Sequence, residues 1–148
     1  MNEEPILQVV FFRMESGREP VREWLKELDT GDRKTIGEDI KLVQFRWPLG
    51  APLVDNMNQY SGSSFDDFLD EEGILDEVTA TAYKRLWALQ VQDAMAEAQL
   101  SKSELAGRLQ TSRSQLDRLL DPENTAVTLD SMERLARAVG KQLVLRLA

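Results

Sequence analysis

The chain has 148 residues, 42% hydrophobic and 30% charged, a composition typical of a soluble globular protein with one ordinary domain or two very small ones. It contains no cysteine and no histidine, which excludes disulfides, thiolate nucleophiles, Cys/His zinc sites and imidazole acid–base chemistry. No apolar run approaches the roughly 20 residues of a membrane span, and the acidic start is unlike a signal peptide. We therefore expect a cytoplasmic protein without a cofactor.

The net charge of −8 is distributed unevenly along the chain. Residues 58–77 contain seven acidic side chains and no basic one, whereas residues 78–148 contain ten basic and eight acidic side chains. An acidic protein is a poor general binder of nucleic acid, so a positive surface must come from the C-terminal part.

The first part of the chain predicts a strand followed by two helices. Residues 6–14, ILQVVFFRM, are β-branched and aromatic, which is typical of a strand. Pro20 begins a helix, Asp29–Asp32 interrupts it, and a second helix covers about residues 33–45 before the Pro- and Gly-rich residues 48–52. The residues expected to face the core are Val21, Trp24, Leu25, Leu28, Ile36, Ile40, Val43 and, as further candidates, Leu42, Phe45 and Trp47.

The two helical stretches PVREWLKEL (20–28) and DRKTIGEDIKLVQFRWPLGAPLV (32–54), with the opening strand, resemble the first half of HigB-like toxins of the RelE/ParE superfamily. The resemblance implies a truncated toxin fragment over residues 1–56. In that family further antiparallel strands follow and carry the residues that cleave ribosome-bound mRNA. Nothing after Val54 corresponds to them, so we expect no catalytic residue and no enzymatic activity.

Residues 57–78 predict an acidic, flexible segment with one short helix. Ser64 is a candidate N-cap, and Gly73 is expected to end the helix. One interpretation is a solvated connector that packs its apolar side chains on a neighbour. The other is a partner-binding segment that orders on a HigB-like toxin or on the chain's own N-terminal fragment. The candidate partner-binding residues are Phe65, Phe68, Leu69 and Ile74.

A long helix is expected from Thr79, and two short capped helices follow it. Ser101-x-x-Glu104 is a capping box, and residues 112–115 form a second one after a break at Gln110-Thr111. Two such helices describe a helix-turn-helix, with a plain helical hairpin as the alternative. The inward candidates of the long helix are Tyr83, Leu86, Trp87, Leu89 or Gln90, Ala94 and Met95.

The second capped helix presents residue types that suit DNA. Arginine binds guanine O6/N7 and glutamine binds adenine N6/N7, while a lysine beside helix N-terminal amides suits a phosphate. Residues 101–120 contain four basic and two acidic side chains, a locally positive stretch. The candidate DNA-binding residues are Lys102, Ser112, Arg113, Ser114, Gln115 and Arg118.

The stretch LSKSELAGRLQTSRSQLDRLLDPENTAVTLDSMERLARAVGKQLVLRL (100–147) resembles the lambda-repressor-like (XRE) helix-turn-helix and, more narrowly, HigA-like antitoxins. The resemblance implies a homodimer bound to double-stranded operator DNA. Gln110 stands where the turn often has glycine, and a left-handed backbone there would cost about 1 kcal/mol. After Gly140, a candidate C-cap, the alternation of Leu143, Leu145 and Leu147 predicts a terminal strand over residues 142–147.

These observations predict a mainly α fold with small β elements: a β-α-α toxin-like fragment (1–56), an acidic segment (57–78) and a helical DNA-binding domain (79–148) that ends in a strand. The residues from Met57 onward resemble the start of an antitoxin that is joined in frame to a truncated toxin. The join would come from a natural deletion or from engineering. The predicted function is an autorepressing antitoxin-type regulator. The alternatives are a toxin-neutralising protein-binding module with a vestigial helix-turn-helix, and a residual toxin enzyme.

Overall fold

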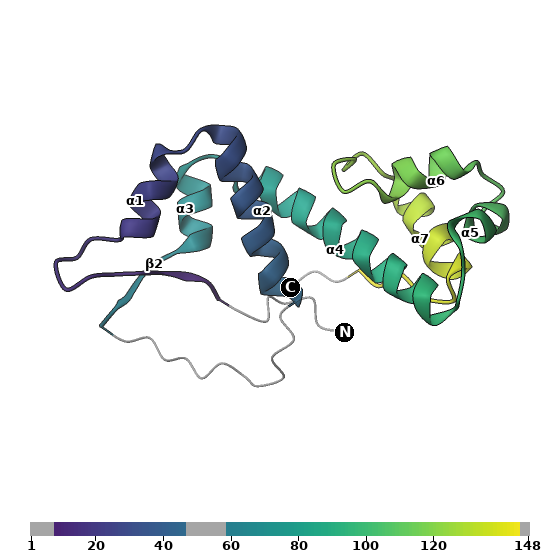
Figure 1. The fold of residues 1–148 in the computed structure, drawn as a ribbon, viewed down its shortest axis with the longest axis horizontal. Helices are drawn as coiled ribbons and strands as arrows, with labels where there is room; N and C mark the ends of the chain where they lie inside the picture. The colour runs from purple at the N-terminus through teal and green to yellow at the C-terminus, as the bar shows by residue number, and fades with distance from the viewer. Residues whose placement is uncertain (1–7, 47–58, 146–148) are drawn as a thin grey trace. The chain divides into compact units, whose positions relative to one another are not determined.

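The computed structural model describes residues 8–46 and 59–145. The chain divides into two compact units, residues 1–82 and 83–148, and the helix α4 (Leu75–Glu97) contributes to both. Each unit has its own hydrophobic core. The described residues are mainly helical with one small sheet (Figure 1), which confirms the predicted fold class.

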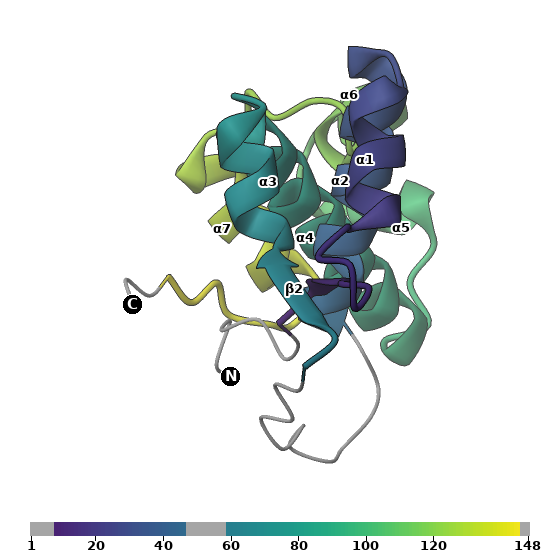
Figure 2. The ribbon, with the colours of Figure 1, turned by 90° about the vertical axis from the view of Figure 1, so that its left-hand side faces the viewer.

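The first unit begins with the predicted order of one strand and two helices. Its sheet pairs β1 with β2 antiparallel, with Val10 opposite Ser64 and Phe12 opposite Ser61. Figure 2 shows β2 running directly into α3. The elements are β1 (Val10–Phe12), α1 (Pro20–Glu27), α2 (Thr30–Arg46), β2 (Ser61–Ser64), α3 (Phe65–Glu71) and the start of α4.

Part of the segment that was expected to be flexible, Ser61–Ser64, forms the strand β2. The amide and hydroxyl of Ser63 donate hydrogen bonds of 2.5 and 2.7 Å to the carboxylate of Glu19. A Cβ on Gly62 would lie 2.7 Å from the carbonyl oxygen of Phe11, so only glycine fits there. The N-terminal strand therefore finds its partner within the same unit.

The core of the first unit joins the N-terminal residues to the acidic segment. Phe11 contacts Phe65 and Phe68, with ring centroids 5.7 and 5.5 Å apart. Partly buried side chains of α2, Ile36 and Ile40, pack against this cluster. The four apolar residues predicted to bind a partner are thus buried inside this chain. The fully buried cluster comprises Phe11, Leu25, Phe65, Phe68, Leu69, Ile74 and Val78.

Ion pairs surround this core and follow a consistent pattern. Basic side chains of α1 and α2 contact acidic side chains of residues 66–77, which gives opposite charges to the two sides of the interface. Residues 66–77 are therefore folded against the N-terminal helices. The pairs are Arg22–Glu71, Arg33–Glu72, Lys34–Glu77 (2.5 Å) and Lys41–Asp66 (2.6 Å).

The apolar spacing of α1 identified only part of its buried face. Leu25 is buried, but Val21 and Trp24 are each 51% exposed, contrary to expectation. Arg22 lies on the inner side instead, with its guanidinium carbon 5.7 Å from the centroid of the Phe68 ring. Arg22 can lie there because Glu71 and Glu19 neutralise it.

The helix α2 also differs from the predicted pattern. It begins at Thr30, and the Asp29 carboxylate accepts a hydrogen bond of 3.0 Å from the amide of Asp32, so the predicted break is its first turn. Val43 is exposed, whereas Lys41 is only 6% exposed and pairs with Asp66. The predictions about Trp47, residues 48–52 and Met57 lie outside the described residues.

The second unit packs three short helices around the C-terminal part of α4, which begins at Leu75 and not at Thr79. Of the inward candidates on α4, Tyr83 is exposed and its neighbour Lys84 is buried. The helices are α5 (Lys102–Arg108), α6 (Arg113–Leu120) and α7 (Leu129–Ala138). The buried core comprises Trp87, Ala88, Val91, Ala94, Met95, Leu105, Ala106, Leu109, Leu116, Leu120, Leu135 and Val139.

The predicted C-terminal strand is not found in its described part. Residues 141–145 follow α7 without regular structure, and residues 146–148, including Leu147, lie outside the described residues. Leu143 packs partly on the core, while Val144 and Leu145 are exposed. The alternating pattern was a weak signal because a strand also needs a hydrogen-bonding neighbour, and none pairs with residues 141–145 among the described residues.

Candidate DNA-binding site

The helix pair α5–α6 begins at the cap predicted from the sequence. The Ser101 hydroxyl accepts a hydrogen bond of 3.2 Å from the amide of Glu104, and the Glu104 carboxylate accepts one of 2.7 Å from the amide of Ser101. The bonds that the Ser101 amide and hydroxyl donate to the Glu104 carboxylate lower the pKa of Glu104, so the cap is strongest when the carboxyl is ionised. The capping box therefore fixes where α5 starts.

The turn between α5 and α6 contains a left-handed residue at Gln110, the conformation that was expected to be costly for a residue other than glycine. Gln110 has φ 53°, and its amide donates to the carbonyl of Gly107 while the amide of Thr111 donates to that of Ala106. These two bonds form a Schellman motif, which satisfies the last carbonyls of α5. Buried Ala106 lies beside this turn, where a small side chain lets the helices approach.

The helix α6 is anchored at both ends and along its inner face. Ser112 caps its start by accepting a bond of 3.1 Å from the amide of Gln115, and Leu116 and Leu120 are buried in the core. At its C-terminal end, Lys84 donates bonds of 2.5 and 2.9 Å to the carbonyl oxygens of Leu119 and Asp121. The helix orientation is therefore set by the core and by both caps.

Burial lowers the pKa of Lys84, and the nearby charge of Asp121 partly opposes this effect. Lys84 is 4% exposed, and its ammonium lies 5.1 Å from the centroid of the Trp87 ring. Buried lysines are uncommon unless paired, and no pattern in the sequence indicates this role. Asn124, also absent from the sequence candidates, donates a bond of 3.0 Å to the carbonyl oxygen of Arg118.

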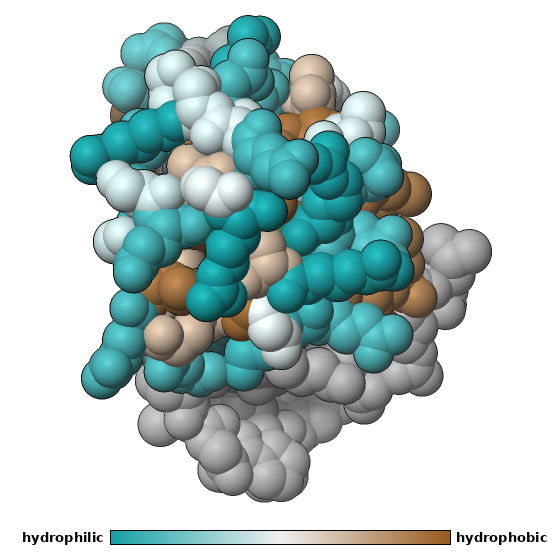
Figure 3. All heavy atoms as spheres, turned by 90° about the vertical axis from the view of Figure 1, so that its right-hand side faces the viewer, coloured by the Kyte–Doolittle hydropathy of each residue, from teal (hydrophilic) through white to brown (hydrophobic). Residues whose placement is uncertain are grey.

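The predicted DNA-binding residues all lie on the exposed side of this helix pair. The first turn of α6 brings four of them together, and one turn further on Arg118 is also exposed. Figure 3 shows a face of the molecule on which hydrophilic side chains predominate, with smaller hydrophobic patches between them. The residues at the start of α6 are Ser112, Arg113, Ser114 and Gln115.

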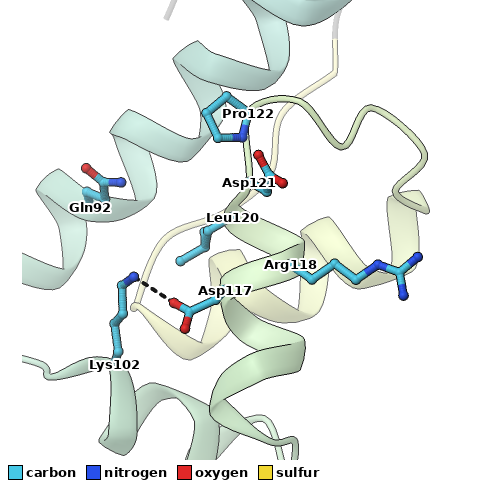
Figure 4. A pocket seen from close by; sticks show the side chains of 7 residues that line it. All are labelled: Gln92, Lys102, Asp117, Arg118, Leu120, Asp121 and Pro122. Atoms are coloured by element: carbon cyan, nitrogen blue, oxygen red, sulfur yellow. Dashed lines mark hydrogen bonds and ion pairs between the residues drawn. The ribbon is translucent and has the colours of Figure 1, made fainter.

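Lys102 lies at the first position of α5 and reaches α6. Its ammonium is 2.7 Å from the carboxylate of Asp117 (Figure 4), a residue that was not among the sequence candidates. The hydrogen bond from Lys102 lowers the pKa of Asp117, and the charge of Arg113 lowers it further. The candidate site thus contains an ionised carboxylate among its cations.

Within the part of the chain that the structure describes, no group of three or more acidic side chains is arranged to hold a metal ion. None of the helices in the described ranges combines the length and hydropathy that a membrane span requires. The predicted partner-binding residues Phe65, Phe68, Leu69 and Ile74 belong to the other unit and take no part in this site.

Residues 90–143 match the family of Cro/C1-type helix-turn-helix (HTH) DNA-binding domains, which confirms the predicted XRE-like helix-turn-helix. The matched range contains α5, α6 and α7 in full. No curated protein and no solved structure matches the chain. The match indicates a DNA-binding transcriptional regulator, a class of protein that is typically not enzymatic.

Proposed function

We propose that the chain is a sequence-specific transcriptional regulator of antitoxin type that represses its own toxin–antitoxin operon. The observation that carries the proposal is the first turn of α6, which presents Arg113, Ser114 and Gln115 to solvent while Leu116 holds the helix on the core. These side chains have the donors and acceptors that discriminate bases in the major groove. The match to a Cro/C1-type domain supports the same function.

In this proposal α6 lies in the major groove of operator DNA. Lys102 and the N-terminal amides of the helices contact phosphates and fix the register, while Arg113 and Gln115 contact base edges. The chain acts as a homodimer, and its operator is a palindrome with half-sites about one helical turn apart.

The antitoxin part of the proposal is supported by the first unit. Acidic side chains of residues 66–77 contact basic side chains of the two helices that resemble a HigB-like toxin. Phe65 and Phe68 lie in the hydrophobic core of the same unit. An antitoxin segment bound to its toxin would use the same opposite charges and apolar contacts. Residues 1–56 are then a truncated toxin fragment without nuclease activity, and residues 57–78 are the segment that covers it.

This contact also favours a second candidate function, a protein-binding module that neutralises a toxin through residues 58–78 while its HTH is vestigial. The experiment is a titration of the full chain against its own upstream DNA, against scrambled DNA and against an intact HigB-like toxin. The proposed regulator binds the upstream DNA more tightly than the scrambled DNA. Binding to toxin with equal, weak binding to both DNAs supports the second candidate and contradicts the first.

A further inference from the structure

The ion pair between Lys102 and Asp117 joins the two helices of the HTH on its solvent side. Lys102 is the first residue of α5, Asp117 is the fifth residue of α6, and both side chains are about half exposed. In Figure 4 the two side chains point toward each other, and Arg118 points away from them. The pair also lines a hollow of about 500 Å³, together with Gln92 of α4, Arg118 and Asp121, so both charged groups are open to solvent.

Asp117 differs from the other carboxylate of the HTH. Glu104 is occupied by the capping box, where it accepts bonds from Ser101. Asp117 instead faces Lys102 and lies near Arg113, two cations placed to meet DNA. An exposed ion pair contributes little to folding stability, so the effect of Asp117 is better sought in the charge that DNA encounters.

We propose that Asp117 is an internal competitor for the DNA phosphate that Lys102 binds, and that it thereby sets the strength and salt dependence of DNA binding. This inference rests on the proposed DNA-binding function. In the free protein the carboxylate holds the ammonium of Lys102. In the complex a phosphate oxygen takes its place, and Asp117 is left unpaired beside the phosphate backbone. Both the lost ion pair and the repulsion that follows weaken binding to every sequence equally, because phosphates carry no sequence information.

The test uses Asp117→Asn in the full chain, which keeps the shape of the side chain and removes its charge. The charge-matched control is Asp130→Asn, which removes one exposed carboxylate from the first turn of α7. The probe is a random-sequence duplex, titrated by fluorescence anisotropy at several salt concentrations. We expect Asp117→Asn to bind about three- to tenfold more tightly at low salt, with a slope of log K against log salt that is steeper by roughly one.

A second pair of variants separates competition from a role in positioning Lys102. Lys102→Met should weaken binding more in the Asp117→Asn background than in the parent, because the lysine is then free for phosphate. If Asp117→Asn binds more weakly than the parent, or no differently from Asp130→Asn, the inference is wrong while the proposed function stands. If neither the parent nor Asp117→Asn binds any duplex, the inference and the proposed function are both wrong.

Discussion

The buried ammonium of Lys84 donates a hydrogen bond of 2.5 Å to the carbonyl oxygen of Leu119, so a side chain of α4 caps the last turn of α6. Its second bond, to the carbonyl oxygen of Asp121, holds the start of the following loop. The helix that carries the candidate base-reading residues is therefore tied to the core by a residue outside the helix-turn-helix.

Replacement of Lys84 by Met should lower the free energy of unfolding of the second unit by about 1–3 kcal/mol, because two carbonyl groups lose their charged donor. Urea unfolding followed by circular dichroism measures the change. Lys141→Met is the control, since it removes an exposed pair with Glu97 and should cost at most about 1 kcal/mol. Equal effects of the two substitutions would contradict the capping role of Lys84.

Acid should destabilise the first unit through Glu19. Burial raises the pKa of Glu19, but hydrogen bonds from the Ser63 hydroxyl and amide and the charge of Arg22 outweigh it, and the pKa is lowered from 4.5. The contribution of Glu19 to the free energy of unfolding is therefore present above pH 4.5. It is lost as the pH falls through the lowered pKa of the folded state. Between pH 7 and pH 3, the free energy of unfolding should fall less in Glu19→Gln than in the parent. Glu15→Gln, at an exposed position, should behave as the parent.

Gly62→Ala tests the close approach of β1 and β2. The new Cβ would lie 2.2 Å from the Glu19 carboxylate and 2.7 Å from the carbonyl oxygen of Phe11, so the strands must separate. We expect the free energy of unfolding to fall by about 1–3 kcal/mol, as at overpacked sites. The change should be visible as faster hydrogen exchange at the amide of Phe65, which donates a hydrogen bond to the carbonyl oxygen of Val9. Gly107→Ala meets no atom within 4 Å and should be neutral or stabilising. Unchanged exchange in Gly62→Ala would show that the strands are not packed as described.

The double substitution Phe65→Asp, Phe68→Asp tests whether the acidic segment holds the N-terminal residues in their fold. Both rings are buried against Phe11, and burying two carboxylates there is strongly unfavourable. Limited proteolysis should cleave the first unit rapidly and leave residues 83–148 resistant. Phe12→Asp, at a side chain that is 56% exposed, is the control. If the double variant is as resistant as the parent, the acidic segment does not stabilise residues 8–46.

The sequence predicted well those features that depend on bonds within a few residues. Ser64, Ser101 and Ser112 cap helices as expected, because an N-cap bonds to an amide only two or three positions away. Gly73, with φ 71°, ends α3 as expected. The break between the two helices at Gln110-Thr111 was also foreseen, since one helix must stop there before the next begins.

Several features that depend on distant partners were not foreseen, although the packing of Phe65 and Phe68 on the chain's own N-terminal fragment was one of the predicted alternatives. Arg22, Lys41 and Lys84 lie on inner faces only because the fold supplies a carboxylate or a carbonyl to each. The strand β2 has no β-propensity of its own and forms because β1 and Glu19 bind it. The position of Asp117 beside Lys102 likewise depends on the angle between α5 and α6. The spacing of residues in the sequence does not predict this angle.

The central claim, that α6 reads DNA sequence, is tested most directly by binding of Arg113→Ala and Gln115→Ala to the upstream DNA and to its scrambled counterpart. Both side chains are exposed and make no contribution to the buried core, so each variant should fold as the parent does. We predict that each substitution weakens the free energy of binding to the cognate site by about 1–3 kcal/mol. The losses at scrambled DNA should be smaller. If both variants bind cognate and scrambled DNA as the parent does, the assignment of α6 as the recognition helix is contradicted.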